Sequence, residues 1–112
     1  MMSQFANTPT PPYYAVIFTS LKKDDTNGYA QMAGHMSALV TTQPGFLGAE
    51  SVRDEAGFGV TISYWESLEA IRNWKRNEEH QVAQDKGKKE WYQQYVTRVC
   101  KVERAYSLHD LE

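Results

Sequence analysis

The sequence predicts an α+β domain whose elements follow in the order strand, helix, strand, strand, helix, strand. Three observations support this prediction. β-branched and aromatic residues fill four short segments, apolar residues recur every three or four positions in two others, and a Gly-marked reversal separates the two middle strands. This order is the split βαβ, or ferredoxin-like, arrangement (βαββαβ), with a four-stranded antiparallel sheet and both helices on one face.

The first strand follows a polar stretch. Residues 1–12 carry three of the four prolines, so we expect a flexible or extended tail ahead of one domain over residues 13–112. Residues 13–20 are aromatic and β-branched, and both faces of this segment are apolar. That pattern is typical of a central strand, which is covered on both sides.

The first helix is predicted from capping residues and an apolar stripe. Asp24, Asp25 and Thr26 supply N-cap chemistry. The residues of the stripe are spaced by three and four, namely Tyr29, Met32, Ala33, Met36, Leu39 and Val40. Pro44-Gly45 then ends the helix.

The two middle strands cover residues 46–53 and 58–65, and residues 54–57 form a turn in which Gly57 supplies a positive φ. Such a short turn joins only antiparallel strands. The second of these strands alternates cleanly, with Phe58, Val60, Ile62 and Tyr64 on one face and Gly59, Thr61, Ser63 and Trp65 on the other. The pattern leaves open which set lies beneath the helices.

Ser67 is a suitable N-cap for the second helix, whose apolar stripe contains Leu68, Ile71 and Trp74. Gly87 is expected to break the helix into a second piece. The last strand is expected over residues 92–106. Its apolar residues Val96, Val99 and Val102 are three apart, which a regular strand does not place on one face. We therefore expect a bulge, or a strand that serves two surfaces in turn.

Both faces of the predicted sheet carry large side chains, while only one face has helices over it. An apolar face without cover needs a partner. We therefore expect a homodimer in which two sheets face each other and form an α+β barrel.

Composition excludes several classes of function. The net charge of −2 and the pI of about 5.9 disfavour nucleic-acid binding. The apolar runs are too short to span a membrane, and the first residues do not read as a secretory signal. The single cysteine fits a reducing compartment, so we expect a cytoplasmic protein. No zinc-ligand spacing, phosphate-binding Gly-rich loop or Gly-x-Ser-x-Gly elbow is present in the sequence.

The stretch from Pro44 to Trp91 contains all three tryptophans. Its motifs are Gly45-Phe46-Leu47-Gly48 with Glu50-Ser51, then Ser63-Tyr64-Trp65-Glu66-Ser67, then Trp74 and His80. In order and spacing these resemble the antibiotic biosynthesis monooxygenase (ABM) family, in particular its small bacterial members, over about residues 13–106. The resemblance implies a dimeric α+β barrel with a pocket between helices and sheet in each subunit.

The resemblance implies one of two activities. One is cofactor-independent oxygenation of polycyclic phenols. The other is oxidative haem degradation, which uses an axial His and a Trp on the second helix and an Asn on the first strand. Trp74 matches the helix Trp, but Gln84 stands where the His is expected, and residues 13–20 contain no Asn. These departures argue against haem, so we expect no cofactor and no metal.

The favoured hypothesis is a monooxygenase that oxidises a small aromatic, phenolic or quinone-like substrate with O2. His80 is the expected base because its pKa lies near neutrality, Tyr64 donates a hydrogen bond to a substrate oxygen, and Trp74 stacks on the ring. The expected substrate-binding residues are Trp65, His35, Met36 and Phe18. His35 is also a second possible base.

Each of these residues has a structural alternative. Trp65, Trp74 and Tyr64 also suit a plain core, and His80 suits a solvated or capping position. Trp91 suits dimer or hinge packing, Cys100 suits a small buried residue, and the charged residues from 75 to 90 suit a solvated face. Two other functions stay open, a haem-binding or haem-degrading monooxygenase and a non-enzymatic dimeric small-molecule binding or stress protein.

Overall fold

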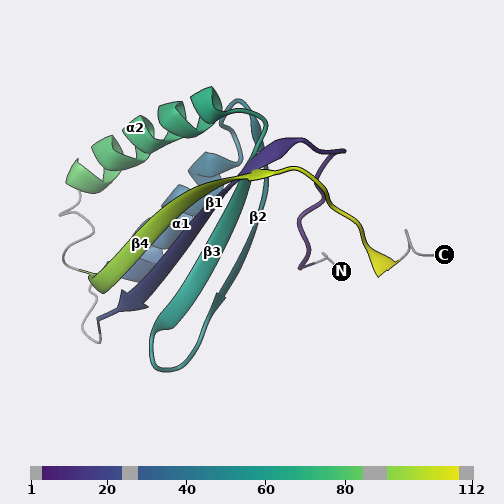
Figure 1. The fold of residues 1–112 in the computed structure, drawn as a ribbon. Helices are drawn as coiled ribbons and strands as arrows, with labels where there is room; N and C mark the ends of the chain where they lie inside the picture. The colour runs from purple at the N-terminus through teal and green to yellow at the C-terminus, as the bar shows by residue number, and fades with distance from the viewer. Residues whose placement is uncertain (1–3, 24–27, 85–90, 109–112) are drawn as a thin grey trace.

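The computed structural model describes residues 4–23, 28–84 and 91–108, and from residue 79 to the end of the second helix it describes the backbone without the side chains. Figure 1 shows a single sheet with two helices. The elements are β1 (Tyr13–Lys22), α1 (Tyr29–Val40), β2 (Phe46–Arg53), β3 (Phe58–Trp65), α2 (Leu68–Gln84) and β4 (Tyr92–Val102). The predicted ferredoxin-like order is confirmed.

The four strands form an antiparallel sheet in the order β2-β3-β1-β4. β1 is hydrogen-bonded on both sides, so the prediction of a central first strand is confirmed. It extends to Lys22, two residues beyond the predicted end, while β4 ends at Val102 rather than at Tyr106. Both helices lie over the same face of the sheet, which we call the covered face (Figure 1). The other face is the open face.

The strand register decides which side chains lie beneath the helices. Thr61 pairs with Phe18, and Ser63 pairs with Val16, and all four line the space under the helices. The alternate set, which includes Ile62, therefore lies on the open face. The sequence predicted both sets correctly, and the register assigns each to a face.

The expected irregularity of the last strand is present at its start. The register between β1 and β4 shifts where Leu21 and Lys22 pair with Gln94 and Tyr92. This bulge turns the side chain of Tyr92 toward the covered face, where it lines the space under the helices.

Beyond the bulge, β4 alternates between the two faces. Val99 pairs with Val16 on the covered face. Val96 and Val102 pair with Thr19 and Tyr13, which lie on the open face. The strand therefore contains a bulge, but at its start and not among the valines, whose spacing follows from regular alternation. The alternative of a strand long enough to serve two surfaces in turn stays a prediction.

Local turns explain how α2 is positioned. The Ser67 hydroxyl accepts a hydrogen bond from the backbone N–H of Ala70 at 3.0 Å, which confirms the predicted N-cap. Gly45 has φ of 85°, and a Cβ built there would lie 2.7 Å from the Cβ of Ala70. Only glycine therefore lets the chain before β2 pass this close to α2.

The turn between β2 and β3 contains Gly57 with φ of 97°, as expected. α1 begins after Gly28, which is left-handed and makes no side-chain cap. The predicted capping residues Asp24, Asp25 and Thr26, and the predicted helix break at Gly87, lie outside the described residues.

Residues 4–12 contain no helix or strand. The backbone N–H of Ala6 donates a hydrogen bond to Glu50 Oε2 at 3.0 Å, and the hydroxyls of Thr8 and Tyr13 are 2.9 Å apart. These contacts attach the N-terminal segment to the sheet. The flexibility expected for this tail stays a prediction.

The buried core is small. Its apolar residues are Tyr13, Ala15, Trp65, Ile71 and Trp91. No residue of α1 is buried, so this helix lies over the sheet without packing tightly against it.

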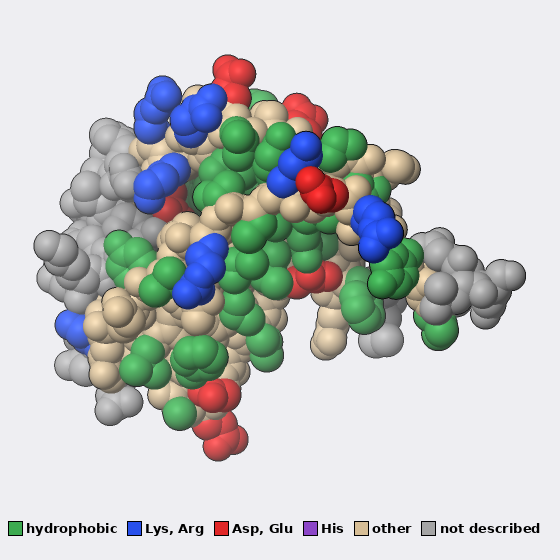
Figure 2. All heavy atoms as spheres, viewed as in Figure 1, with side chains coloured by type: hydrophobic (Ala, Val, Ile, Leu, Met, Phe, Trp, Pro, Cys, Tyr) green, Lys and Arg blue, Asp and Glu red, His purple; other side chains and the backbone are tan. Residues whose placement is uncertain are grey.

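In Figure 2 hydrophobic side chains are exposed across the middle of the molecule, with Lys and Arg side chains above them over α2. β4 contributes exposed apolar residues, Tyr95, Val96 and Val99. No helix in the described part of the chain is long and apolar enough to cross a bilayer.

Candidate active site

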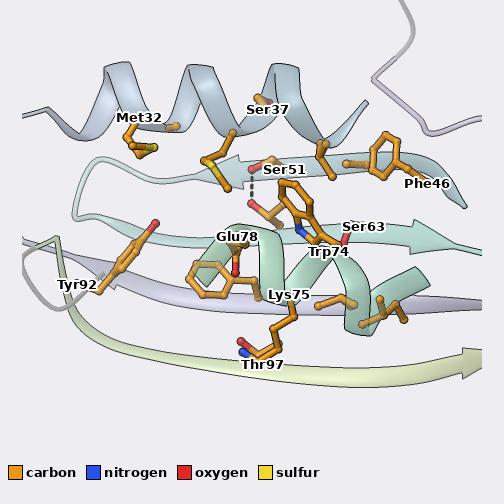
Figure 3. A pocket seen from close by; sticks show the side chains of 18 of the residues that line it. Met32, Ser37, Phe46, Ser51, Ser63, Trp74, Lys75, Glu78, Tyr92 and Thr97 are labelled. Atoms are coloured by element: carbon orange, nitrogen blue, oxygen red, sulfur yellow. Dashed lines mark hydrogen bonds between the residues drawn. The ribbon is translucent and has the colours of Figure 1, made fainter. Parts of the chain in front are cut away.

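A cavity of about 720 Å³ separates the two helices from the covered face of the sheet. Its volume falls within the range of pockets that bind small molecules. Figure 3 shows its labelled residues coming from both helices and from strands of the sheet, including Met32, Trp74, Ser51, Tyr92 and Thr97. The cavity exists because α1 stands away from the sheet.

One end of the cavity is apolar and rests on stacked indoles. Trp74 reaches in from α2 (Figure 3). Its ring stacks on that of Trp65 with centroids 6.2 Å apart and planes 28° apart. Trp65 is fully buried, meets Phe46 edge-on at 5.3 Å, and donates its indole N–H to Ser63 Oγ at 2.9 Å. Trp65 therefore fixes the position of Trp74 from behind.

The floor of the cavity carries hydroxyl groups. Ser51 Oγ and Thr61 Oγ1 are 2.7 Å apart across β2 and β3, as the dashed line in Figure 3 shows. Ser63 and Thr97 add two more hydroxyls from β3 and β4. A flat ligand between this floor and the methionines of α1 would meet an apolar wall on one side and hydrogen-bonding groups on the other.

The other end of the cavity is an aromatic cluster of Phe18, Tyr29, Trp91 and Tyr92. The Tyr92 hydroxyl donates a hydrogen bond to the Tyr29 hydroxyl at 3.3 Å. The Tyr29 ring meets the rings of Trp91 and Tyr92 edge-on at 5.9 and 5.8 Å. Phe18 meets Tyr92 in the same way at 5.4 Å. These contacts hold both tyrosines in one orientation.

Two cations flank these tyrosines. Lys22 Nζ lies 5.0 Å from the centre of the Tyr29 ring, and Arg53 Cζ lies 5.9 Å from that of Tyr92. Arg53 also donates a hydrogen bond to Ser20 Oγ at 2.7 Å, which fixes its guanidinium. Burial raises the pKa of Tyr92, and so does its hydrogen bond to Tyr29, so this phenol stays protonated at neutral pH.

Residues 12–86 match the family model described as antibiotic biosynthesis monooxygenase. The chain belongs to the ABM family. It is 51% identical over 104 residues to YqjZ, an uncharacterized protein of Bacillus subtilis (strain 168), and the match covers 93% of this chain and 91% of that protein.

Two solved structures share the fold of this ABM protein. One is a Pseudomonas aeruginosa protein, with a TM-score of 0.65 and 15% identity over 88% of this chain and 99% of the other. The second is SnoaB, described as a cofactor-independent oxygenase from Streptomyces nogalater, with a TM-score of 0.59 and 13% identity over 87% of this chain and 96% of the other. At these identities the likeness shows the fold alone.

The cavity of the ABM chain gathers three of the seven residues predicted for the site, Trp74, Phe18 and Met36. Trp65 lies behind Trp74 and does not line the cavity. His35 is exposed on α1 and is also not among the lining residues. The backbone of His80 belongs to α2, but its side chain lies outside the described residues.

Tyr64 lies on the open face, away from the cavity. Its hydroxyl donates a hydrogen bond to Glu50 Oε1 at 2.7 Å, and its ring meets that of Tyr13 edge-on at 5.8 Å. Burial, followed by the bond to Glu50, raises the pKa of Tyr64 to about 12. Tyr64 and Trp65 are neighbours in the sequence, so the strand sends them to opposite faces.

Sequence reasoning missed the aromatic end of the site. Tyr29 was visible as part of the α1 stripe, but Tyr92 reaches the cavity only through the bulge in β4. Trp91, expected in dimer or hinge packing, is buried and lines the cavity. Glu78, expected on a solvated face, lines it as well.

Cys100 corrects a further expectation, since it is exposed and not buried. It pairs with Ala15 on the open face of an edge strand, where nothing described covers it. Among the described residues no group of three or more His, Cys, Asp or Glu side chains is placed to hold a metal ion.

Proposed function

We propose that this ABM protein is a monooxygenase that works without a bound cofactor and oxidises a small aromatic, phenolic or quinone-like substrate with O2. The observation that carries the proposal is the cavity of about 720 Å³ with a fixed indole, Trp74, at one end and two phenols at the other. Membership of the ABM family and a fold shared with a cofactor-independent oxygenase support the same reading.

The chemistry needs only the substrate and O2. Removal of a proton from a phenol with an activated CH2 group gives an electron-rich anion. The anion passes one electron to O2, and the resulting radical and superoxide combine at that carbon as a peroxide anion. The proton taken by the base returns to this anion and gives a hydroperoxide. Loss of water leaves a carbonyl, so one oxygen atom enters the product, the other becomes water, and the substrate supplies every electron.

The protein would contribute binding, orientation and a base. Trp74 stacks on the substrate ring, and the apolar side chains of α1 keep water away from the anion. His80 stays the proposed base because imidazole titrates near neutrality. Glu78 reaches the cavity from the same helix and is the alternative base in the described part of the chain.

The proposal includes a homodimer in the cytoplasm. Ile17 and Ile62 pair at the centre of the open face, and Val52 and Phe58 are 68% and 56% exposed. An apolar sheet face of this kind is typical of an interface, and a second copy of the same face matches it in shape and polarity. Pairing of two open faces would leave each cavity accessible from its own subunit.

Oxygen uptake with a panel of phenols and hydroquinones tests this function. The wild-type protein should consume O2 faster than buffer with at least one of them. Trp74→Phe and His80→Ala should lose turnover while their circular dichroism spectra stay native, and Tyr64→Phe on the open face is the matched control. Uptake at the buffer rate with every compound would sink the proposal, and unchanged turnover in both variants would remove the two assigned roles.

A further inference from the structure

We propose that the Tyr29 hydroxyl, supported by Tyr92, binds the oxygen of a phenolic ligand as that oxygen becomes an oxyanion. This inference rests on the proposed function for its chemistry, and it names the ligand class and the end of the cavity that receives the reacting oxygen. The ring system would then extend toward Trp74 at the opposite end. No residue of the sequence-based hypothesis other than Phe18 lies in this cluster.

The direction of the hydrogen bond between the tyrosines leaves one proton for a ligand. The Tyr92 hydroxyl donates to the Tyr29 oxygen at 3.3 Å. Among the residues that the structure describes, this is the hydrogen bond that Tyr29 makes, and a hydroxyl that accepts still has its own O–H to donate. Both side chains line the cavity, so the Tyr29 proton can meet a ligand oxygen there.

Packing fixes the two rings before any ligand arrives. Tyr29 is held edge-on by Trp91 at 5.9 Å and by Tyr92 at 5.8 Å. Tyr92 is held by Phe18 at 5.4 Å. A donor that is already oriented spends no free energy on reorganisation when charge develops on the ligand, which is how an oxyanion site stabilises its occupant.

The charges around the tyrosines favour an anion. Lys22 lies over the ring of Tyr29, and Arg53 lies over that of Tyr92. Glu78 is the opposing group, since its charge contributes to the raised pKa of Tyr92. Among the residues that the structure describes, Lys22 and Arg53 are the cations close to the two tyrosines, and Glu78 is the carboxylate. The two cations favour a phenolate oxygen here over the end of the cavity that carries Trp74.

The protonated state of Tyr92 sustains the chain of donors. Burial and the hydrogen bond to Tyr29 raise its pKa, so the hydroxyl stays a donor at neutral and at alkaline pH and continues to polarise Tyr29. Hydrogen bonds to an ionised partner are roughly twice as strong as those between neutral groups. Removing the hydroxyl of Tyr29 should therefore cost more for a bound phenolate than for a neutral ligand of the same shape.

Binding of 4-nitrophenol tests the inference, because its ionisation is visible in its absorbance. Titrations above and below the pKa of the probe would compare the wild-type protein with Tyr29→Phe, Tyr92→Phe and Tyr64→Phe. We expect Tyr29→Phe to weaken binding of the phenolate about 10-fold and to raise the apparent pKa of the bound probe. Tyr92→Phe should have an effect of a few-fold, and Tyr64→Phe, on the open face, should have none.

Nitrobenzene, which has no hydroxyl, is the matched ligand. Its affinity should be the same in the wild-type protein and in Tyr29→Phe. The inference is overturned if the wild-type protein does not bind 4-nitrophenolate, or if Tyr29→Phe binds it as tightly as the wild type does. It is also overturned if Tyr29→Phe loses as much affinity for nitrobenzene as for 4-nitrophenolate. Because electron-poor nitrophenols do not reduce O2, this result is independent of whether oxygen uptake is found.

Discussion

The two faces of the sheet differ in what their side chains meet. On the covered face, Thr61 and Ser63 open onto a cavity with Trp74 at one end and Tyr29 and Tyr92 at the other. On the open face, Ile17 pairs with Ile62, and Tyr64 is tied to Glu50. Residues that are neighbours in one strand thus have different proposed roles, ligand binding beneath the helices and assembly on the other side.

The largest expected effect comes from the residue that supports the covered face. Trp65→Ala should lower the free energy of unfolding by about 3–5 kcal/mol, because a fully buried indole leaves a void beneath Trp74. Urea denaturation followed by circular dichroism measures it. Gln31→Ala, at an exposed site on α1 away from the open face, should change stability by less than about 0.5 kcal/mol. Equal costs in the two variants would contradict the claim that Trp65 is a core residue that supports Trp74.

A charge placed on either face should separate assembly from binding. Ile62→Glu should weaken the proposed dimer by about 3 kcal/mol, because it buries an unpaired carboxylate between two open faces. Thr61→Glu, one residue away, should leave the dimer intact and block the cavity. Light scattering reports the mass, and 4-nitrophenol titration reports binding.

Two results would contradict the predictions for Ile62→Glu and Thr61→Glu. A wild-type mass near 12.8 kDa, the mass of one chain, would show that the open face is not a dimer interface. A dimer that survives Ile62→Glu would place the interface elsewhere on the molecule.

Tyr64→Phe should have a smaller effect, confined to stability. It removes the hydrogen bond of 2.7 Å to Glu50 and should cost about 1 kcal/mol at neutral pH. Because Tyr64 lies on the open face, oxygen uptake and phenol binding should match the wild type. A loss of turnover in a folded, dimeric Tyr64→Phe protein would instead place this hydroxyl in the chemistry.

The smallest expected effect is a dependence of stability on alkaline pH. The folded protein raises the pKa of Tyr64 from 10.0 to about 12, so it holds this proton more tightly than the unfolded chain does. The resulting stabilisation is complete below about pH 10 and is lost as the pH rises through 12. Urea denaturation at pH 8 and pH 11 should show that the free energy of unfolding declines less between these pH values in Tyr64→Phe than in the wild-type protein. Identical declines would mean that the pKa of Tyr64 is the same in the folded protein and in the unfolded chain.

The order of the elements was predictable because it depends on local patterns. Residues 58–65 alternate with a period of two, and Ser67 caps the next helix through its own hydroxyl. Such signals act over a few residues and survive in the folded chain. The assignment of Thr61 to the covered face was not predictable, because it depends on the register with β1, a segment about 40 residues away.

Cavity residues were predictable from the sequence only where a regular apolar pattern along one helix or strand marks them. Met36 and Trp74 lie on faces that periodicity marks as apolar, and both line the cavity. The pairing of Tyr29 with Tyr92 joins residues 63 positions apart, and it needs a bulge that shifts the register. No local pattern contains that information. For the same reason, adjacent positions such as Tyr64 and Trp65 were assigned to one pocket although they diverge.

Product analysis with isotope-labelled dioxygen, on the wild-type protein and on Thr61→Glu, tests the central claim most directly. The account predicts that the wild-type protein places one labelled oxygen atom in the product and one in water, and that Thr61→Glu falls to the rate of buffer while staying dimeric. Labelled product formed at equal rates by both proteins would contradict the claim that oxidation takes place between the helices and the covered face. Unlabelled product would contradict the claim of oxygenation itself.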